Sequence, residues 1–350
     1  MPDEQGSFMS RRGFVQTAAL AAGTLGAPDL TRAAASAEVK IGLYSITYGG
    51  VWYRGDALTV EQVIGRAHQF GYQGVEIDGK RPHGNPLDMP AARCRDLRRL
   101  AADQGIEIYA VAGNNDFSSP IPEHRETQLV YMRELMRMTS DLGAKIVRAF
   151  LAWPGVTILP EGGGRYDIAQ AVWRTEHQNF SADQTWAWCR DTLREAARLA
   201  GDFGVTLALQ NHPPVIENGY RDCLRMVNEI ASPHLKICFD ARLEHHLDEA
   251  GVRRGINEVG PLQILWHYGG EFDRGPDGIA VKGDEKALAE MLGLFDVGYH
   301  GYAGFELCHP LPVVNGRTVG LEFVDKNAQL AAEYMRGILT EAKKSHAARG

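Results

Sequence analysis

Apolar residues along this chain of 350 residues fall into two alternating patterns. Short runs rich in β-branched and aromatic side chains predict buried strands, and longer segments with apolar residues every three or four positions predict amphipathic helices. The eight strand-like runs are VKIGLYSI (39–46), GVEI (74–77), IEIYAVAG (106–113), AKIVRAFL (144–151), VTLALQNH (205–212), LKICFD (235–240), LQILWHYGG (262–270) and YAGFELC (302–308).

Helical segments separate these runs, and their predicted ends carry start and stop signals. Capping-box patterns begin at Thr59 and Ser181, where a hydroxyl residue precedes Gln by three positions. Glycines stand where helix C-caps are expected, just before the next strand, at Gly71, Gly105, Gly143 and Gly204. Strand, helix and glycine therefore repeat as a unit along the chain.

Eight such units predict a parallel α/β fold, and we expect a single-domain (β/α)8 TIM barrel over residues 38–340, followed by a C-terminal tail over 341–350. The alternative is an open α/β sheet. No G-x-G-x-x-G follows the first strand to support a dinucleotide-binding version of that alternative.

Residues 1–37 have the features of a twin-arginine export signal. Arg11 and Arg12 precede a soft apolar run from about Val15 to Leu25, and Ala35-Ser36-Ala37 is an A-x-A cleavage site. We therefore expect a periplasmic or otherwise exported protein. The twin-arginine route carries folded chains, which suits a protein that loads a metal before export.

The net charge and the composition argue against two classes of partner, nucleic acids and membranes. The net charge is −7, with 44% hydrophobic and 23% charged residues, which is ordinary for a globular protein and argues against nucleic-acid binding. After residue 40 no stretch reaches the length of a membrane span, so no membrane contact is expected after signal cleavage. The five cysteines form no C-x-x-C pair and are read as buried small side chains.

Four polar residues end four successive strand-like runs, about 30 to 40 residues apart: Gln210, Asp240, His267 and Glu306. In a (β/α)8 barrel the C-terminal strand ends meet at one mouth, where active sites lie. Two carboxylates, an imidazole and an amide oxygen converging there suit a hard or borderline divalent metal.

The same runs carry a resemblance to a known family. LALQNHPP, CFDARLEHH, WHYGG and GFELCHP, together with GVEI, resemble the sugar-phosphate isomerase/epimerase superfamily with a xylose-isomerase-like barrel, over about residues 38–340. The resemblance implies metal ligands at Gln210, Asp240, His267 and Glu306. It also implies Mn²⁺ as the first choice of metal, with Mg²⁺, Co²⁺ or Zn²⁺ as alternatives.

One departure from the family pattern bears on mechanism. The position of Gln210 is most often Glu in the epimerases, and an amide cannot exchange a proton at neutral pH. His212, on the same strand face, is the replacement base that we expect, with a ligand-orienting role as the alternative. Glu306 is a further acid or base candidate while it ligates.

Other candidates are expected around the mouth as substrate-binding residues: Glu76, Asn114, Arg148, His245, Glu271 and His309. For Glu76 the alternative is an ion-pair partner, and for Arg148 it is a counter-ion to the acidic cluster. Trp52, Trp153 and Trp266 are candidates for stacking on a sugar face. Two long loops, at 153–180 and from residue 310, either shape the mouth or form oligomer contacts.

These features predict a metal-dependent enzyme that removes a proton next to the carbonyl of a small sugar or keto-sugar. The family resemblance favours an isomerase or epimerase. Gln210 with His212 favours a one-base lyase or dehydratase on a keto-sugar or 3-keto-glycoside. A non-catalytic periplasmic sugar- or metal-binding barrel is the second alternative. Homo-oligomerisation is left open.

Overall fold

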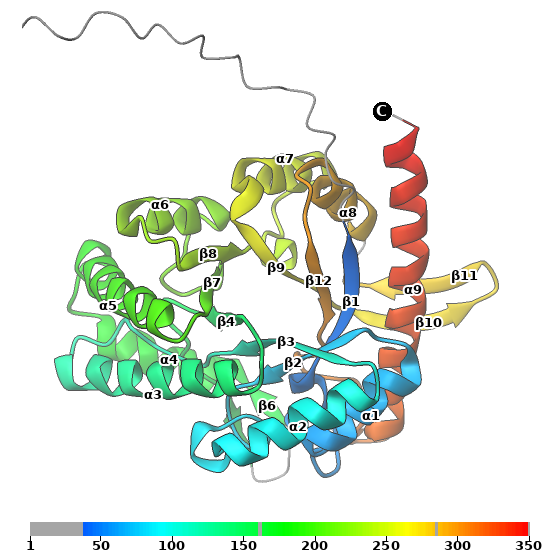
Figure 1. The fold of residues 1–350 in the computed structure, drawn as a ribbon, viewed down its shortest axis with the longest axis horizontal. Helices are drawn as coiled ribbons and strands as arrows, with labels where there is room; N and C mark the ends of the chain where they lie inside the picture. Colours follow the sequence, from blue (N-terminus) through cyan, green and yellow to red (C-terminus); the bar gives the residue numbers. More distant parts are fainter. Residues whose placement is uncertain (1–37, 160–162, 284–285, 349–350) are drawn as a thin grey trace, which may run out of the picture. The chain divides into compact units, whose positions relative to one another are not determined.

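The computed structural model describes residues 38–159, 163–283 and 286–348, and within them the predicted barrel is confirmed. Parallel strands close in the order β1-β12-β9-β8-β7-β4-β3-β2, with helices between them in sequence (Figure 1). The export signal predicted at 1–37 lies outside the described residues and stays a prediction. No helix in the described ranges has the length and apolar character needed to cross a membrane.

Each of the eight predicted runs overlaps one barrel strand: β1 (Val39–Tyr44), β2 (Gly74–Asp78), β3 (Glu107–Ala112), β4 (Ile146–Ala149), β7 (Thr206–Gln210), β8 (Leu235–Cys238), β9 (Gln263–Tyr268) and β12 (Gly301–Phe305). The helices are α1 (Val60–Phe70), α2 (Ala91–Asp103), α3 (Pro122–Asp141), α4 (Tyr166–His177), α5 (Ala182–Asp202), α6 (Tyr220–Ile230), α7 (Glu249–Val259), α8 (Ala287–Asp296) and α9 (Leu321–Ala347). Short 3-10 turns are η1 (Ser45–Tyr48), η2 (Pro86–Asp88), η3 (Ala241–Leu243) and η4 (Gly260–Leu262).

Local signals fix the helix ends as the sequence indicates. Thr59 and Ser181 each accept a hydrogen bond from the backbone of the third helical residue, and the glutamine there bonds back, so both capping boxes are confirmed. Gly71 ends α1 in the left-handed region with φ 77°, which a side chain would disfavour.

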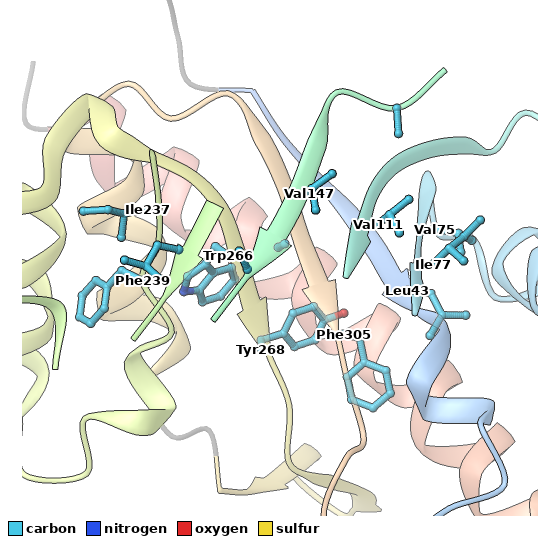
Figure 2. Packing of buried hydrophobic residues seen from close by; sticks show 14 of the residues in the cluster. Leu43, Val75, Ile77, Val111, Val147, Ile237, Phe239, Trp266, Tyr268 and Phe305 are labelled. Atoms are coloured by element: carbon cyan, nitrogen blue, oxygen red, sulfur yellow. The ribbon is translucent and has the colours of Figure 1, made fainter. Parts of the chain in front are cut away.

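Strand alternation divides the buried side chains into two layers. Outward-facing residues such as Val75, Ile237, Trp266 and Phe305 form the large core between the barrel and its helices (Figure 2). Their neighbours in sequence face the barrel axis. The outer core therefore holds the barrel together and leaves the inner face available for polar groups near its C-terminal end.

Aromatic side chains fill the lower interior of the barrel. The rings of Tyr109 and Tyr302 stack with centroids 4.0 Å apart, among Ala208, Cys238 and Leu265. Gly42 lies against Tyr109, and a Cβ there would fall 2.5 Å from the ring. This packing forms a solid floor beneath the polar layer.

The two long segments predicted as loops contain structure that the sequence reading missed. The first carries the hairpin β5 (Thr157–Ile158) and β6 (Gly164–Arg165) followed by α4. The second carries the hairpin β13 (Val313–Val314) and β14 (Arg317–Thr318), joined by an Asn-Gly turn with positive φ at both residues. A third hairpin, β10 (Glu271–Gly275) and β11 (Gly278–Lys282), follows β9.

The last helix runs beyond the boundary expected at residue 340. α9 continues to Ala347 and packs against α8, α1 and β1. Buried Leu339 and Ala342 keep its final turns on the barrel, and the Ala, Glu and Lys residues there are good helix formers. The described part of the expected tail is therefore helical.

Two glycine-to-alanine variants test the packed floor. We expect Gly42→Ala to destabilise the fold by about 1–3 kcal/mol, because its Cβ overlaps the Tyr109 ring. Gly65→Ala is the matched control, since Gly65 lies in α1 with nothing within 4 Å of its added Cβ. It should be stabilising by roughly 0.5–1 kcal/mol. Thermal unfolding measures both, and equal effects of one sign would contradict the packing described.

Candidate active site

A layer of polar side chains fills the upper end of the barrel interior. Alternation along the strands turns one polar residue from each of several strands toward the axis, in the C-terminal part of the strand or just beyond it. All members are buried: Tyr44, Glu76, Arg148, Gln210, Asp240, His267 and Glu306. Groups this polar are tolerated inside a protein only when they are bonded to one another.

Asp240, His267 and Glu306 form a cluster that fits a divalent metal. One donor atom from each lies within 4.8 Å of the others. Carboxylate oxygen and imidazole nitrogen are suitable ligands for such an ion. The Nε2 atom of His267 donates to Glu76 Oε2 at 2.7 Å, so in the neutral ring the lone pair is on Nδ1. A carboxylate that fixes the tautomer of a ligating histidine is a common arrangement around metals.

Arg148 links the cluster to the opposite side of the barrel. Its Nε donates to Glu76 Oε1 at 3.1 Å and its Nη1 donates to Gln210 Oε1. The guanidinium lies over the rings of Tyr44 and Phe150, 4.9 and 5.0 Å from their centroids. Burial would lower the pKa of Arg148, but nearby Tyr44 and Glu76 raise it well above its usual value. Arg148 is therefore a fixed cation.

Gln210, predicted as a ligand, is joined to both charged neighbours. Its Oε1 accepts from Arg148, and its Nε2 donates to Asp240 Oδ2 at 3.1 Å. The amide oxygen that would coordinate a metal is thus engaged with the guanidinium in this structure. Gln210 orients Asp240 while adding no charge to the layer.

Arg242 is a member of the site that the sequence reasoning missed. Its Nη2 donates to Asp240 Oδ2 at 2.9 Å and also to Glu306 Oε1, while its Nε donates to Asp240 Oδ1 at 3.2 Å. Burial raises the pKa of Glu306, but Arg242, His267 and Arg148 outweigh it and bring the pKa to about 2. The sequence does contain a sign of this ion pair: a carboxylate, Asp240, and a cation, Arg242, lie two positions apart just after a strand.

His212, the predicted base, lies in the wall of the cavity above this layer. Its Nδ1 is 2.6 Å from the carbonyl of Pro213, which can only accept, so Nδ1 carries the proton. The lone pair of the neutral ring is then on Nε2. Burial lowers the pKa of His212 from its usual 6.5, which favours the neutral form at pH 7. The ring is held edge-on by Phe150 and Trp153.

A cavity of about 680 Å³ opens onto these groups. Of the residues predicted at the mouth, five line this cavity: Asn114, Arg148, His245, Glu271 and His309. Glu76 does not line it. Its side chain is fully buried and bonds Arg148 and His267, which is the ion-pair alternative rather than the expected substrate contact.

The long insertion after β4 forms an aromatic wall of the cavity. Trp153 and Tyr166 line it together with Trp52, whose ring centroid is 4.9 Å from that of Tyr166. The mouth-shaping interpretation of segment 153–180 is therefore the one that the geometry supports. Trp266 was a third stacking candidate, but it belongs to the outer core because its neighbour His267 faces the axis.

Comparison with known proteins agrees with this fold. Residues 64–310 match the family model described as xylose isomerase-like TIM barrel, so the chain belongs to that family. Fructoselysine 3-epimerase from Escherichia coli O157:H7 is 23% identical over 259 residues, which cover 71% of this chain and 86% of that protein. The Shigella flexneri protein of the same name matches equally.

Solved structures of sugar epimerases share the fold. D-psicose 3-epimerase from Clostridium cellulolyticum H10, crystallised with D-tagatose, has a TM-score of 0.65 and 19% identity over 86% of this chain and 99% of its own. A 3-keto-D-glucoside 4-epimerase from E. coli has a TM-score of 0.59 and 17% identity over 85% of this chain and 98% of its own. At this identity the likeness extends to the fold alone.

The buried position of Glu76 predicts a large effect on stability. Glu76→Gln keeps the shape but leaves the Arg148 guanidinium without its carboxylate, and breaking one side of a buried pair costs about 3–5 kcal/mol. Asp96→Asn is the control, because Asp96 pairs with Arg99 on the surface, where about 0.5 kcal/mol or less is expected. Urea unfolding compares them, and similar losses for both variants would refute the role given to Glu76.

Proposed function

We propose that this protein is a divalent-metal-dependent sugar isomerase or epimerase-like enzyme. It would abstract a proton next to the carbonyl of a sugar or keto-sugar. The observation that carries the proposal is the Asp240, His267 and Glu306 cluster, of which Asp240 and Glu306 line a large cavity. Membership of the xylose isomerase-like TIM barrel family and the sugar epimerases among similar proteins support it.

The residues of the chain have distinct proposed roles. Asp240, His267 and Glu306 would hold the metal, and Gln210 would be a fourth ligand if its oxygen were free of Arg148. When bound, the metal would act as a Lewis acid on a substrate carbonyl or hydroxyl. His212 accepts the proton through Nε2, since Pro213 fixes the other nitrogen as a donor.

Polar groups around the cavity would orient the sugar. Asn114 is itself held by Lys80 and Asp78, and His309 lies 3.3 Å from Glu271. The aromatic wall offers flat faces to the apolar side of a sugar ring. These contacts would place the acidic carbon beside His212 and exclude bulk water from it.

A one-base lyase or dehydratase on a keto-sugar or 3-keto-glycoside is the second candidate. The observation that favours it is the engagement of Gln210 with Arg148 and Asp240. An epimerase that moves protons on two faces of one carbon needs a second base, and an amide cannot serve. A non-catalytic sugar- or metal-binding barrel would retain metal and ligand without any proton exchange.

Metal binding by the Asp240 cluster is directly testable. We expect the purified protein to bind close to one equivalent of Mn²⁺ or a related divalent ion. Asp240→Ala should lose it, because one of two anionic donors is removed. Metal analysis after dialysis measures the content, with Asp222→Ala as a control acid that lies outside the cluster. Stoichiometric metal in Asp240→Ala would mean that the ligand set is wrong.

His212 is tested by proton exchange. His212→Ala should retain metal but lose about 10²- to 10⁴-fold in rate, the usual contribution of a general base. Proton NMR of keto-sugars in D₂O follows both turnover and the entry of deuterium at each carbon. A fully active His212→Ala enzyme would remove His212 from the mechanism.

Gln210→Glu separates the two enzyme readings in the same assay. It places a carboxylate where the amide now donates to Asp240. An epimerase should gain deuterium exchange on the second face of the carbon, whereas a one-base lyase should gain nothing. A wild-type protein that exchanges no proton with any keto-sugar tested, yet binds sugar, would favour the binding-protein alternative.

A further inference from the structure

The cation between Asp240 and Glu306 in this structure is a side chain of the protein itself. One nitrogen of Arg242, Nη2, donates to Asp240 Oδ2 at 2.9 Å and also to Glu306 Oε1. A second nitrogen, Nε, bonds the other oxygen of Asp240. These carboxylates belong to the cluster that fits a metal. The guanidinium and a metal therefore require the same two ligands.

The position of Arg242 is built into the fold. Its backbone N–H donates to Asp240 Oδ1 at 3.1 Å, so the turn η3 begins on the carboxylate that its side chain binds. At Gly269 an added Cβ would lie 2.0 Å from Arg242 Nη1. Gly269, just after β9, thus provides the space in which the guanidinium lies, and the Arg242 side chain is only 17% exposed.

The net charge of the polar layer indicates that Arg242 and a divalent ion compete for the carboxylates rather than occupy the layer together. With His267 counted as neutral, Glu76, Asp240 and Glu306 carry three negative charges against two positive charges on Arg148 and Arg242, a formal total of −1. Adding a divalent ion with Arg242 in place would make the layer +1 in a low-dielectric interior. If Arg242 leaves the layer as the ion enters, the total is zero, which burial tolerates best.

We propose that Arg242 is an internal counter-cation that occupies the Asp240–Glu306 gap and must be displaced when a metal binds. The inference rests on the metal-dependent function proposed above. Arg242 also lines the cavity, so its guanidinium has room to move on that side. The residue sets metal affinity by competition, and it keeps the two carboxylates stable in the metal-free protein.

Metal titration of charge-matched variants tests this proposal. Arg242→Met removes the charge and keeps most of the stem, whereas Arg242→Lys keeps a positive charge without the planar fork. Lys282→Met is the matched control. Lys282 is exposed in the cavity wall, so this substitution removes the same positive charge from a residue that bonds neither carboxylate. Each full-length protein is stripped with a chelator and titrated with Mn²⁺ by calorimetry.

We expect Arg242→Met to bind Mn²⁺ at least tenfold more tightly than the unaltered protein, with Lys282→Met within about twofold of it, because charge–charge effects at the rim are screened. The Mn²⁺ affinity of Arg242→Lys should lie between those of Arg242→Met and the unaltered protein. Thermal unfolding gives an independent readout. Metal-free Arg242→Met should melt at least about 5 °C lower, since Asp240 and Glu306 lose their shared cation, and Mn²⁺ should raise its Tm more than that of the unaltered protein.

Two other outcomes would be informative in different ways. Equal or weaker Mn²⁺ binding by Arg242→Met, with metal still bound by both proteins, would overturn the competition and leave the proposed function intact. If no protein in the series binds Mn²⁺, Mg²⁺, Co²⁺ or Zn²⁺, the competition and the metal dependence of the proposed function would both fail.

Discussion

The negative charge of the carboxylates buried in the upper barrel must be balanced by nearby positive charge, and this constraint determines how the site is arranged. Glu76, Asp240 and Glu306 are each at most 5% exposed, where an uncompensated charge would be very costly. Two guanidinium groups meet the need: Arg148 bonds Glu76, and Arg242 bridges Asp240 and Glu306. Arg148 also orients the Gln210 amide, whose Nε2 then donates to Asp240, and Glu76 accepts from His267 Nε2.

The (β/α)8 barrel can hold such a layer because its stability comes from elsewhere. Residues such as Trp266 and Phe305 bury large apolar surfaces between strands and helices, while adjacent His267 and Glu306 serve the site. The stacked tyrosines below close the interior to solvent. Because successive residues of a strand face opposite sides, one residue packs in the outer core and the next belongs to the polar layer. The inner polar residues therefore contribute little to the apolar packing.

Patterns among residues close in sequence predicted the fold and much of the site. Hydrogen bonds between polar residues far apart in sequence could not be predicted in this way. The eight strand runs and both capping boxes depend on residues close in sequence, and alternation correctly turned Asp240, His267 and Glu306 to one side. The bond between His267 and Glu76 spans 191 residues and has no sequence pattern. Helix α4, inside a segment expected to be a loop, was missed, and its Ile168 and Val172 are exposed.

Gln210 and Arg242 are best understood together. A carboxylate at position 210 would lie against Asp240, where the amide now donates, and would add a fourth negative charge to the layer. With Glu there and His267 neutral, two guanidinium groups would leave a formal −2, so a divalent ion competing with Arg242 for Asp240 and Glu306 would enter a more negative layer. With Gln there, the arginines nearly balance the acids, so the same ion would gain less from the charge of the layer when it displaces Arg242. Under the function proposed above, the neutral residue would therefore change two properties at once: it would remove a proton acceptor from one face of the substrate, and it would make the displacement of Arg242 by a metal less favourable.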